Sequence, residues 1–129
     1  MGLEERKELE AQVLAILRAH PGREKKVTRA QLVWLLRTSG FLKDVSDDHA
    51  DRRARDAIET LRKTHLEGGH IVSFSETSGY WWSDKAKEIA HAQAEDLSRM
   101  ENTRAKMRNR EALLQRLEAD QLVESRLFP

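Results

Sequence analysis

Residues 45–83 carry the pattern that most limits how this chain can fold, because one helix is followed there by two short strands. Apolar residues recur at helical spacing in the first part, at Ala50, Ala54, Ala57, Ile58 and Leu61. This spacing predicts an amphipathic helix with a narrow apolar stripe. Ser46 or Asp47 can cap its start, since a short oxygen side chain accepts hydrogen bonds from free backbone N–H groups. The pair Gly68-Gly69 is expected to end it, because glycine adopts a left-handed conformation without steric cost.

Two short apolar runs follow this helix. The first consists of Ile71, Val72 and Phe74, the second is Tyr-Trp-Trp at residues 80–82, and turn-forming residues 76–79 lie between them. This arrangement predicts a β-hairpin. Because neighbouring residues of a strand point to opposite faces, one of Trp81 and Trp82 is expected in the core. The two rings therefore cannot form a joint stacking platform for single-stranded nucleic acid.

Two further helices are predicted before this segment. Residues 4–20 carry Leu9, Val13, Ile16 and Leu17 on one face, and Pro21-Gly22 ends the pattern. Residues 29–39 form the second helix, with Thr28 as its cap and a core side made of Leu32, Val33, Leu35 and Leu36. Trp34 lies off this stripe, so it covers the helix edge or faces the C-terminal helix. The three helices are expected to share one core.

A long helix is predicted from a cap at Asp84 to Leu127, since no proline or glycine interrupts these residues. A series with a period of seven residues runs along it through Ala86, Gln93, Met100, Met107, Leu114 and Gln121. This series is too polar for a strong dimeric coiled coil. We therefore expect partner-chain packing or a bend near residues 101–103, with the apolar residues 113–127 as the self-association surface. The basic residues Arg104, Lys106, Arg108 and Arg110 point around the helix, which favours a solvated surface there.

The order of helix, helix, helix, strand, turn and strand matches a winged helix-turn-helix. The run DRRARDAIETLRK followed by GGHIVSFSETSGYWWSD resembles the N-terminal domain of biotin operon repressors, and more closely small phage-encoded winged-helix proteins that place a long helix after the wing. This resemblance implies a mainly α protein with a small β wing (α+β). Residues 1–83 would form the winged helix-turn-helix domain and residues 84–129 a long C-terminal helix. The link at residues 40–47 departs from the pattern, where a tight turn is usual.

The resemblance also implies binding to double-stranded DNA, although it indicates no pathway. We expect a non-catalytic, phage- or mobile-element-encoded protein that acts as a transcriptional regulator or as an origin- or packaging-site binder. The recognition helix would span about residues 47–64 and the wing residues 71–83. Arg52, Arg53 and Asp56 are expected to contact base edges, and Arg55, Arg62 and Lys63 to contact phosphates. Further phosphate contacts are expected from Lys25, Lys26 and Arg29, and minor-groove or backbone contacts from Thr77 and Ser78. A homodimer formed through the C-terminal helix would place two recognition helices on paired half-sites.

Acidic residues near the expected recognition helix oppose this interpretation. The net charge of the chain is +1, and Asp44, Asp47, Asp48 and Asp51 lie at the start of that helix. They would repel phosphate unless they cap the helix or pair with cations. Asp51 and Arg55 are four residues apart, which suits an intrahelical ion pair. The alternative is a winged-helix interaction module that binds a partner or host protein.

Enzyme chemistry is not expected. The chain has no cysteine, no Gly-rich phosphate loop, no HExxH motif and no recognisable Ser/His/Asp signature. A metal site at His65 and His70 would need further ligands, and the sequence suggests none. We therefore expect no cofactor, no metal and no small-molecule substrate. Without an apolar run near 18 residues or a signal-peptide pattern, no membrane association and a cytoplasmic location are expected, in the host cytoplasm or nucleoid if the protein is phage encoded.

Overall fold

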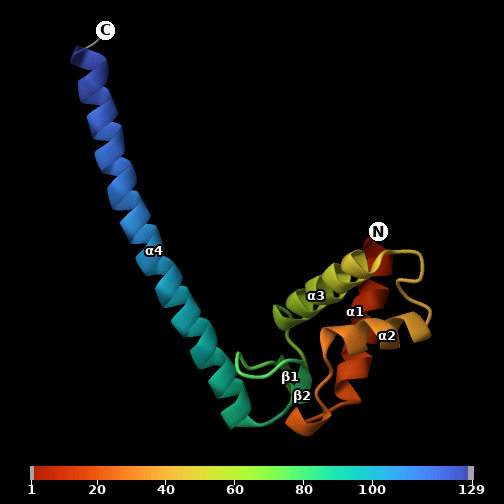
Figure 1. The fold of residues 1–129 in the computed structure, drawn as a ribbon. Coiled ribbons are helices and arrows are strands. Elements are labelled where there is room, and N and C mark those ends of the chain that lie inside the picture. The colour runs from red at the N-terminus through yellow and green to blue at the C-terminus, as the bar shows by residue number, and fades with distance from the viewer. Residues whose placement is uncertain (1, 128–129) are drawn as a thin grey trace. The chain divides into compact units, whose positions relative to one another are not determined.

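The computed structural model describes residues 2–127 and divides the chain into one unit that ends at Ala92 and a second that begins at Gln93. The described residues are mainly helical, with one small antiparallel sheet and a long C-terminal helix (Figure 1), as the sequence predicts. The elements are, in chain order, α1 (Leu3–Arg18), the 3₁₀ turn η1 (Arg23–Lys25), α2 (Arg29–Thr38), α3 (Asp47–Arg62), β1 (His70–Val72), β2 (Trp81–Ser83) and α4 (Ala86–Leu127).

Helices α1, α2 and α3 share the core of the first unit (Figure 1). All four predicted core residues of α1 are buried. Helix α2 begins with a capping box: the Thr28 hydroxyl accepts from the Gln31 N–H at 3.2 Å, and the Gln31 side chain accepts from the Thr28 N–H at 2.9 Å. Reciprocal bonds of this kind satisfy two N–H groups that a helix start leaves free. The predicted second helix and its cap are confirmed.

Helix α3 starts as predicted but ends earlier. Ser46 is the cap, since its hydroxyl accepts from the His49 N–H at 3.3 Å, and the five residues of the predicted apolar stripe are all buried. The prediction that Gly68-Gly69 ends the helix is wrong, because α3 stops at Arg62. The N–H groups of Lys63 and Thr64 bond to carbonyls three residues back, at 3.2 Å and 3.1 Å, which tightens and closes the last turn.

The glycine pair instead forms the connection that leads directly into β1. Gly68 has a φ of 81°, a left-handed conformation that suits glycine. A Cβ atom on Gly69 would lie 2.6 Å from the backbone oxygen of Ser83 and 2.7 Å from the Trp82 ring. Glycine is therefore needed here for a turn and for close packing on β2, and not as a helix stop.

Strand β1 pairs with β2 in antiparallel register, with Ile71 opposite Trp82. The predicted hairpin is correct, although Phe74 and Tyr80 lie outside the strands. Tyr80 is engaged elsewhere, because its backbone exchanges two hydrogen bonds of 2.8 Å with Val27. The Gly22 N–H also donates to the Trp82 carbonyl at 2.9 Å. The connection between α1 and α2 therefore lies along β2, which the sequence did not indicate.

A second apolar cluster joins the hairpin to the start of α4. Phe74 and Trp81 are buried against each other, with ring centroids 5.0 Å apart in an edge-to-face arrangement, and Ile89 and Ala92 pack on them. One of the two adjacent tryptophans was expected in the core, and this residue is Trp81, while Trp82 is half-buried. The first two turns of α4 thus belong to the first unit, beyond the boundary expected at residue 83.

The start of α4 differs slightly from the prediction. The helix begins at Ala86, and the Ser83 hydroxyl, rather than Asp84, accepts the Lys85 N–H at 3.1 Å. The same hydroxyl donates to Glu88 at 2.6 Å, and the Trp81 Nε1–H donates to Glu88 at 3.3 Å. The Glu88 carboxylate therefore fastens the first turn of α4 to β2.

In the second unit, α4 continues without interruption through residues 101–103. The sequence predicted either a bend at these residues or packing of the helix on a partner chain. Its apolar side chains are open to solvent: Leu97, Met100, Met107, Leu113, Leu114, Leu117, Leu122, Val123 and Leu127 are each 44–69% exposed. In residues 2–127, no helix combines the length and apolarity required to cross a membrane.

Candidate nucleic-acid interface

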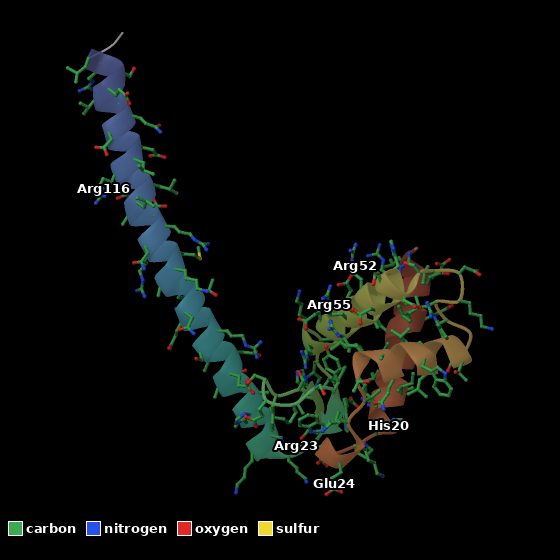
Figure 2. All side chains as sticks on the ribbon, viewed as in Figure 1. His20, Arg23, Glu24, Arg52, Arg55 and Arg116 are labelled. Carbon is green, nitrogen blue, oxygen red and sulfur yellow. The ribbon has the colours of Figure 1, made fainter. Side chains whose placement is uncertain are left out.

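The outer side of α3 carries the first group of predicted contact residues. With 3.6 residues per turn, the buried stripe through Ala54 and Leu61 places Arg52 and Lys63 on the opposite side. Figure 2 shows Arg52 and Arg55 on this outer side, pointing into solvent. These side chains project from a helix whose other side is fixed in the core, and they share the outer side with exposed carboxylates, including that of Asp56 one turn after Arg52.

Arg53 lies elsewhere, although it is adjacent to Arg52 in the sequence. It is half-buried and lines a shallow depression between α3 and α1, together with Asp56, Arg6, Leu9 and Glu10. A rotation of 100° per residue explains the separation, since it turns Arg53 from the outer side toward α1. Of the three residues expected at base edges, Arg52 therefore lies on the outer side and Arg53 at the border with α1, while Asp56 follows Arg52 by one turn on the outer side and also lines this depression.

The opposite border of α3 meets the start of α2 and the hairpin turn. Thr28, Arg29, Asp51, Ser73, Thr77 and Ser78 line one common depression. The predicted contact residues Arg29, Thr77 and Ser78 are thus brought together, next to Asp51 in the first part of α3. Lys26 lies beside the hairpin turn, because its Cβ and Cγ are 3.4 Å from the position of a Cβ on Gly79.

Most of the acidic residues on α3 are paired with arginines at its borders. Arg37 of α2 holds Asp47 at 2.6 Å, Arg29 of α2 holds Asp51 at 3.5 Å, and Arg62 holds Glu59 at 3.3 Å. The expected pair between Asp51 and Arg55 is therefore wrong, because the start of α2 brings Arg29 to Asp51. Such partly exposed pairs add little stability, but they neutralise carboxylates next to the outer side.

The remaining charges on and beside α3 favour an anionic ligand. In the described part of the chain, no ion pair engages Arg52, Arg53, Arg55 or Lys63, nor Asp48 or Asp56. Four unpaired cations thus stand against two unpaired carboxylates, a local excess of +2 (4 − 2). The net charge of the whole chain does not show this excess, which comes from the pairing geometry.

Arg62, expected at phosphate, is instead engaged within the unit. Its Nε donates to the Ile71 carbonyl at 3.3 Å, its Nη2 to the Ser73 hydroxyl at 2.8 Å and its Nη1 to Glu59. Its guanidinium also lies 5.3 Å from the centre of the Tyr80 ring. The side chain is 25% exposed. Arg62 therefore connects the end of α3 to β1 and to the hairpin, and three of its five N–H donors are engaged within the unit.

Replacing Arg62 with alanine is expected to lower the free energy of unfolding by about 2 kcal/mol, since hydrogen bonds to charged groups contribute roughly 1.5–3 kcal/mol. Lys63→Ala is the matched control, because Lys63 is exposed and adjacent, and surface changes stay within about 0.5 kcal/mol. Urea denaturation followed by circular dichroism measures both. Equal effects of the two substitutions would contradict the assigned role of Arg62.

Arg37 organises the link between α2 and α3, a role that the sequence patterns did not indicate. Besides its pair with Asp47, it donates from Nε to the Leu42 carbonyl at 3.2 Å and from Nη2 to the Val45 carbonyl at 2.9 Å. It thereby fixes the long link between α2 and α3 and sets the start of the candidate recognition helix. No local signal could have found it, because the partners lie across an irregular loop.

A separate depression lies on the other side of α2. His20, Lys25, Lys26, Val27, Gln31, Trp34 and Leu35 line it, and the Trp34 side chain is 65% exposed. Trp34 therefore neither enters the core nor covers it fully. Lys25, expected at phosphate, belongs to this depression, whereas Lys26 borders both.

Two observations complete the description of the site. Within residues 2–127, no group of three or more histidines and carboxylates is placed to hold a metal ion. Comparison of the chain with protein-family models, with curated proteins and with solved structures found no match.

Proposed function

We propose that the first unit is a winged helix-turn-helix domain that binds double-stranded DNA, with α3 as the recognition helix and residues 71–83 as the wing. The order α1, α2, α3, β1, β2 supports this fold. The bridge between Val27 and Tyr80 supports it further, because it sets the connection before α2 beside the hairpin. The protein acts without catalysis, as a transcriptional regulator or as an origin- or packaging-site binder of a phage or mobile element.

One observation carries this proposal: the charge arrangement on α3. Arginines at the borders neutralise Asp47, Asp51 and Glu59, and Arg52 and Arg55 remain unpaired on the outer side, within the part of the chain that the structure describes. An arginine in the major groove donates two hydrogen bonds to the O6 and N7 atoms of guanine. Arg52 and Arg55 are therefore assigned to base edges, together with Asp56, which lies one turn after Arg52 on the same side, and Arg53 is assigned to the margin of the contact.

The flanking residues supply the positioning contacts. Lys63 lies on the outer side near the end of α3, and Lys26, Thr77 and Ser78 lie at the start of α2 and in the wing. Lysines and hydroxyl groups bond to phosphate oxygens, which fixes a protein on the duplex without reading its sequence. Glu76 in the wing is exposed and opposes a deep minor-groove contact, so the wing is assigned to the backbone.

The experiment is a fluorescence-anisotropy titration of a labelled random duplex with the full chain over a salt series. Neutralisation of about two phosphates, by Lys63 and Lys26, predicts a loss of affinity of roughly 12-fold between about 50 and 200 mM salt, since the logarithm of the binding constant falls linearly with that of the salt concentration. Selection from a randomised library would then identify the site. No retention at about 50 mM salt would overturn the proposal, because non-specific binding is strongest at low salt.

A second candidate function, a winged-helix module that binds a partner protein, is favoured by Trp34. A tryptophan that is 65% exposed beside Lys25 and Lys26 is unusual for a solvated surface, and tryptophan is enriched among residues that dominate protein interfaces. If the duplex titration shows no binding at low salt, this candidate replaces the first.

A further inference from the structure

In the second unit, one face of α4 carries charges in an order that favours antiparallel over parallel pairing with a second copy of the helix. Lys106, Arg110, Leu113, Leu117, Asp120 and Glu124 follow one another at intervals of four, three, four, three and four residues. This is the spacing of the a and d positions of a heptad repeat, so the six side chains share one face of α4. The stripe differs from the seven-residue series through Met100, Met107 and Leu114.

The centre of the stripe is apolar and open to solvent. Leu113 and Leu117 are 51% and 46% exposed, and Leu114, which borders them, is 51% exposed. Residues three or four apart on a helix are neighbours, so the three leucines form a single patch. A partner that covers this patch must also accept the charges on either side of it.

The charges on the two sides have opposite sign. Lys106 and Arg110 precede the leucines, and Asp120 and Glu124 follow them. Within residues 93–127, none of these four side chains forms an ion pair with another residue of the chain. Their charges are therefore available to a partner helix.

We propose that α4 pairs with a second copy of itself in antiparallel orientation, centred at residue 115. In an antiparallel pair centred at residue 115, residues at equal distances before and after that position face each other, so their numbers add up to 230. Lys106 therefore faces Glu124 of the second copy, Arg110 faces Asp120 and Leu113 faces Leu117. Both symmetry-related halves thus combine one leucine layer with two layers of opposite charge. The inference rests on the proposed self-association through α4 and is independent of DNA binding.

A parallel pair in register is disfavoured by the same residues. Each a or d residue of a parallel dimer faces its own copy, so Arg110 would face Arg110 and Asp120 would face Asp120. Four of the six layers would then hold like charges in contact, which is unfavourable. The antiparallel pair turns all four layers into ion pairs.

The orientation has a consequence for the dimer. In an antiparallel pair, the two chains enter the paired region from opposite ends, so the two DNA-binding units are attached at opposite ends. Such a dimer would hold two separate stretches of duplex, whereas a parallel pair would suit the adjacent half-sites expected from the sequence.

Engineered cysteines test the orientation, because the chain has no cysteine of its own. Full-length Arg110→Cys and Asp120→Cys chains, one of them carrying a size tag, are mixed and oxidised mildly. Antiparallel pairing predicts a disulfide-linked mixed dimer as the main product, and little dimer when each variant is oxidised by itself. The matched control is Arg108→Cys mixed with Leu122→Cys, whose numbers also add up to 230 but which lie on the opposite face of α4, and no cross-link is expected there.

Three results would overturn the inference. A cross-link of Arg110→Cys with itself would show a parallel pair. A cross-link of the control mixture as strong as that of the test mixture would show collision instead of pairing. Sedimentation of the unmodified chain as a monomer would remove the dimer altogether. Because none of these measurements involves DNA, failure of the orientation and failure of DNA binding are separable.

Discussion

Replacing Arg52 and Arg55 together with glutamate is expected to weaken binding to duplex DNA by at least about 100-fold at fixed salt. Each arginine on a base edge contributes roughly 1–3 kcal/mol, and about 2.7 kcal/mol corresponds to a 100-fold change in affinity. The reversal also places two carboxylates against phosphate. Neither side chain is buried or ion-paired in the described residues, so the fold is expected to survive. Fluorescence anisotropy and circular dichroism measure the two properties.

The control for net charge is Arg104→Glu with Arg108→Glu, two exposed positions of the second unit. This variant has the same total charge, and its affinity is expected to change only a few-fold. Arg53→Glu is a second comparison, and a loss much smaller than that of the double reversal is expected because Arg53 borders α1. If the Arg104 and Arg108 variant loses as much affinity as the Arg52 and Arg55 variant, binding depends on global charge and α3 is not the reading element.

The largest loss of stability is expected for Trp81→Ala, about 3–5 kcal/mol. Trp81 is 0% exposed and packs on Phe74, Ile89 and Ala92, and its Nε1–H reaches Glu88. Truncation removes the centre of the cluster that joins the hairpin to α4. Since small domains have unfolding free energies of about 5–15 kcal/mol, such a loss is a large fraction of the total. Urea denaturation followed by far-UV circular dichroism gives the value.

Trp34→Ala is the matched control, because the same side chain is removed from a position that is 65% exposed. Surface substitutions usually change stability by less than about 0.5 kcal/mol, and a change of this size is expected. Similar losses for the two tryptophans would contradict the description of the second apolar cluster.

Local sequence signals were enough to place α1, α2 and α3 and the starts of α2 and α3, but not the end of α3. All five residues of the predicted apolar stripe from Ala50 to Leu61 are buried, and Thr28 and Ser46 cap α2 and α3. A cap acts within one helical turn and an apolar stripe within one helix, so a short stretch of sequence contains each signal. The hairpin followed for the same reason, since its turn residues and both apolar runs are adjacent in the chain.

The features that define the candidate interface depend on partners that are distant in the sequence. Arg29 reaches Asp51 across the α2–α3 link, and Arg62 reaches Ser73 across the turn before β1. The contact of residues 21–27 with β2 is likewise non-local, because Val27 and Tyr80 carry no common pattern. Sequence spacing could place cations on α3, but the assembled fold was needed to separate the unpaired ones from those that hold the unit together.

The most direct test of the account is a titration of the ¹⁵N-labelled full chain with duplex DNA at low salt, followed residue by residue through the amide NMR signals. If α3 reads DNA, the shifted signals are expected on the outer side of α3 around Arg52 and Arg55, at Thr28 and Arg29, and at Thr77 and Ser78. Shifts confined to the depression around Trp34 or to Arg104–Arg110 of α4, or no shifts at all, would contradict the assignment of α3 as the helix that reads DNA.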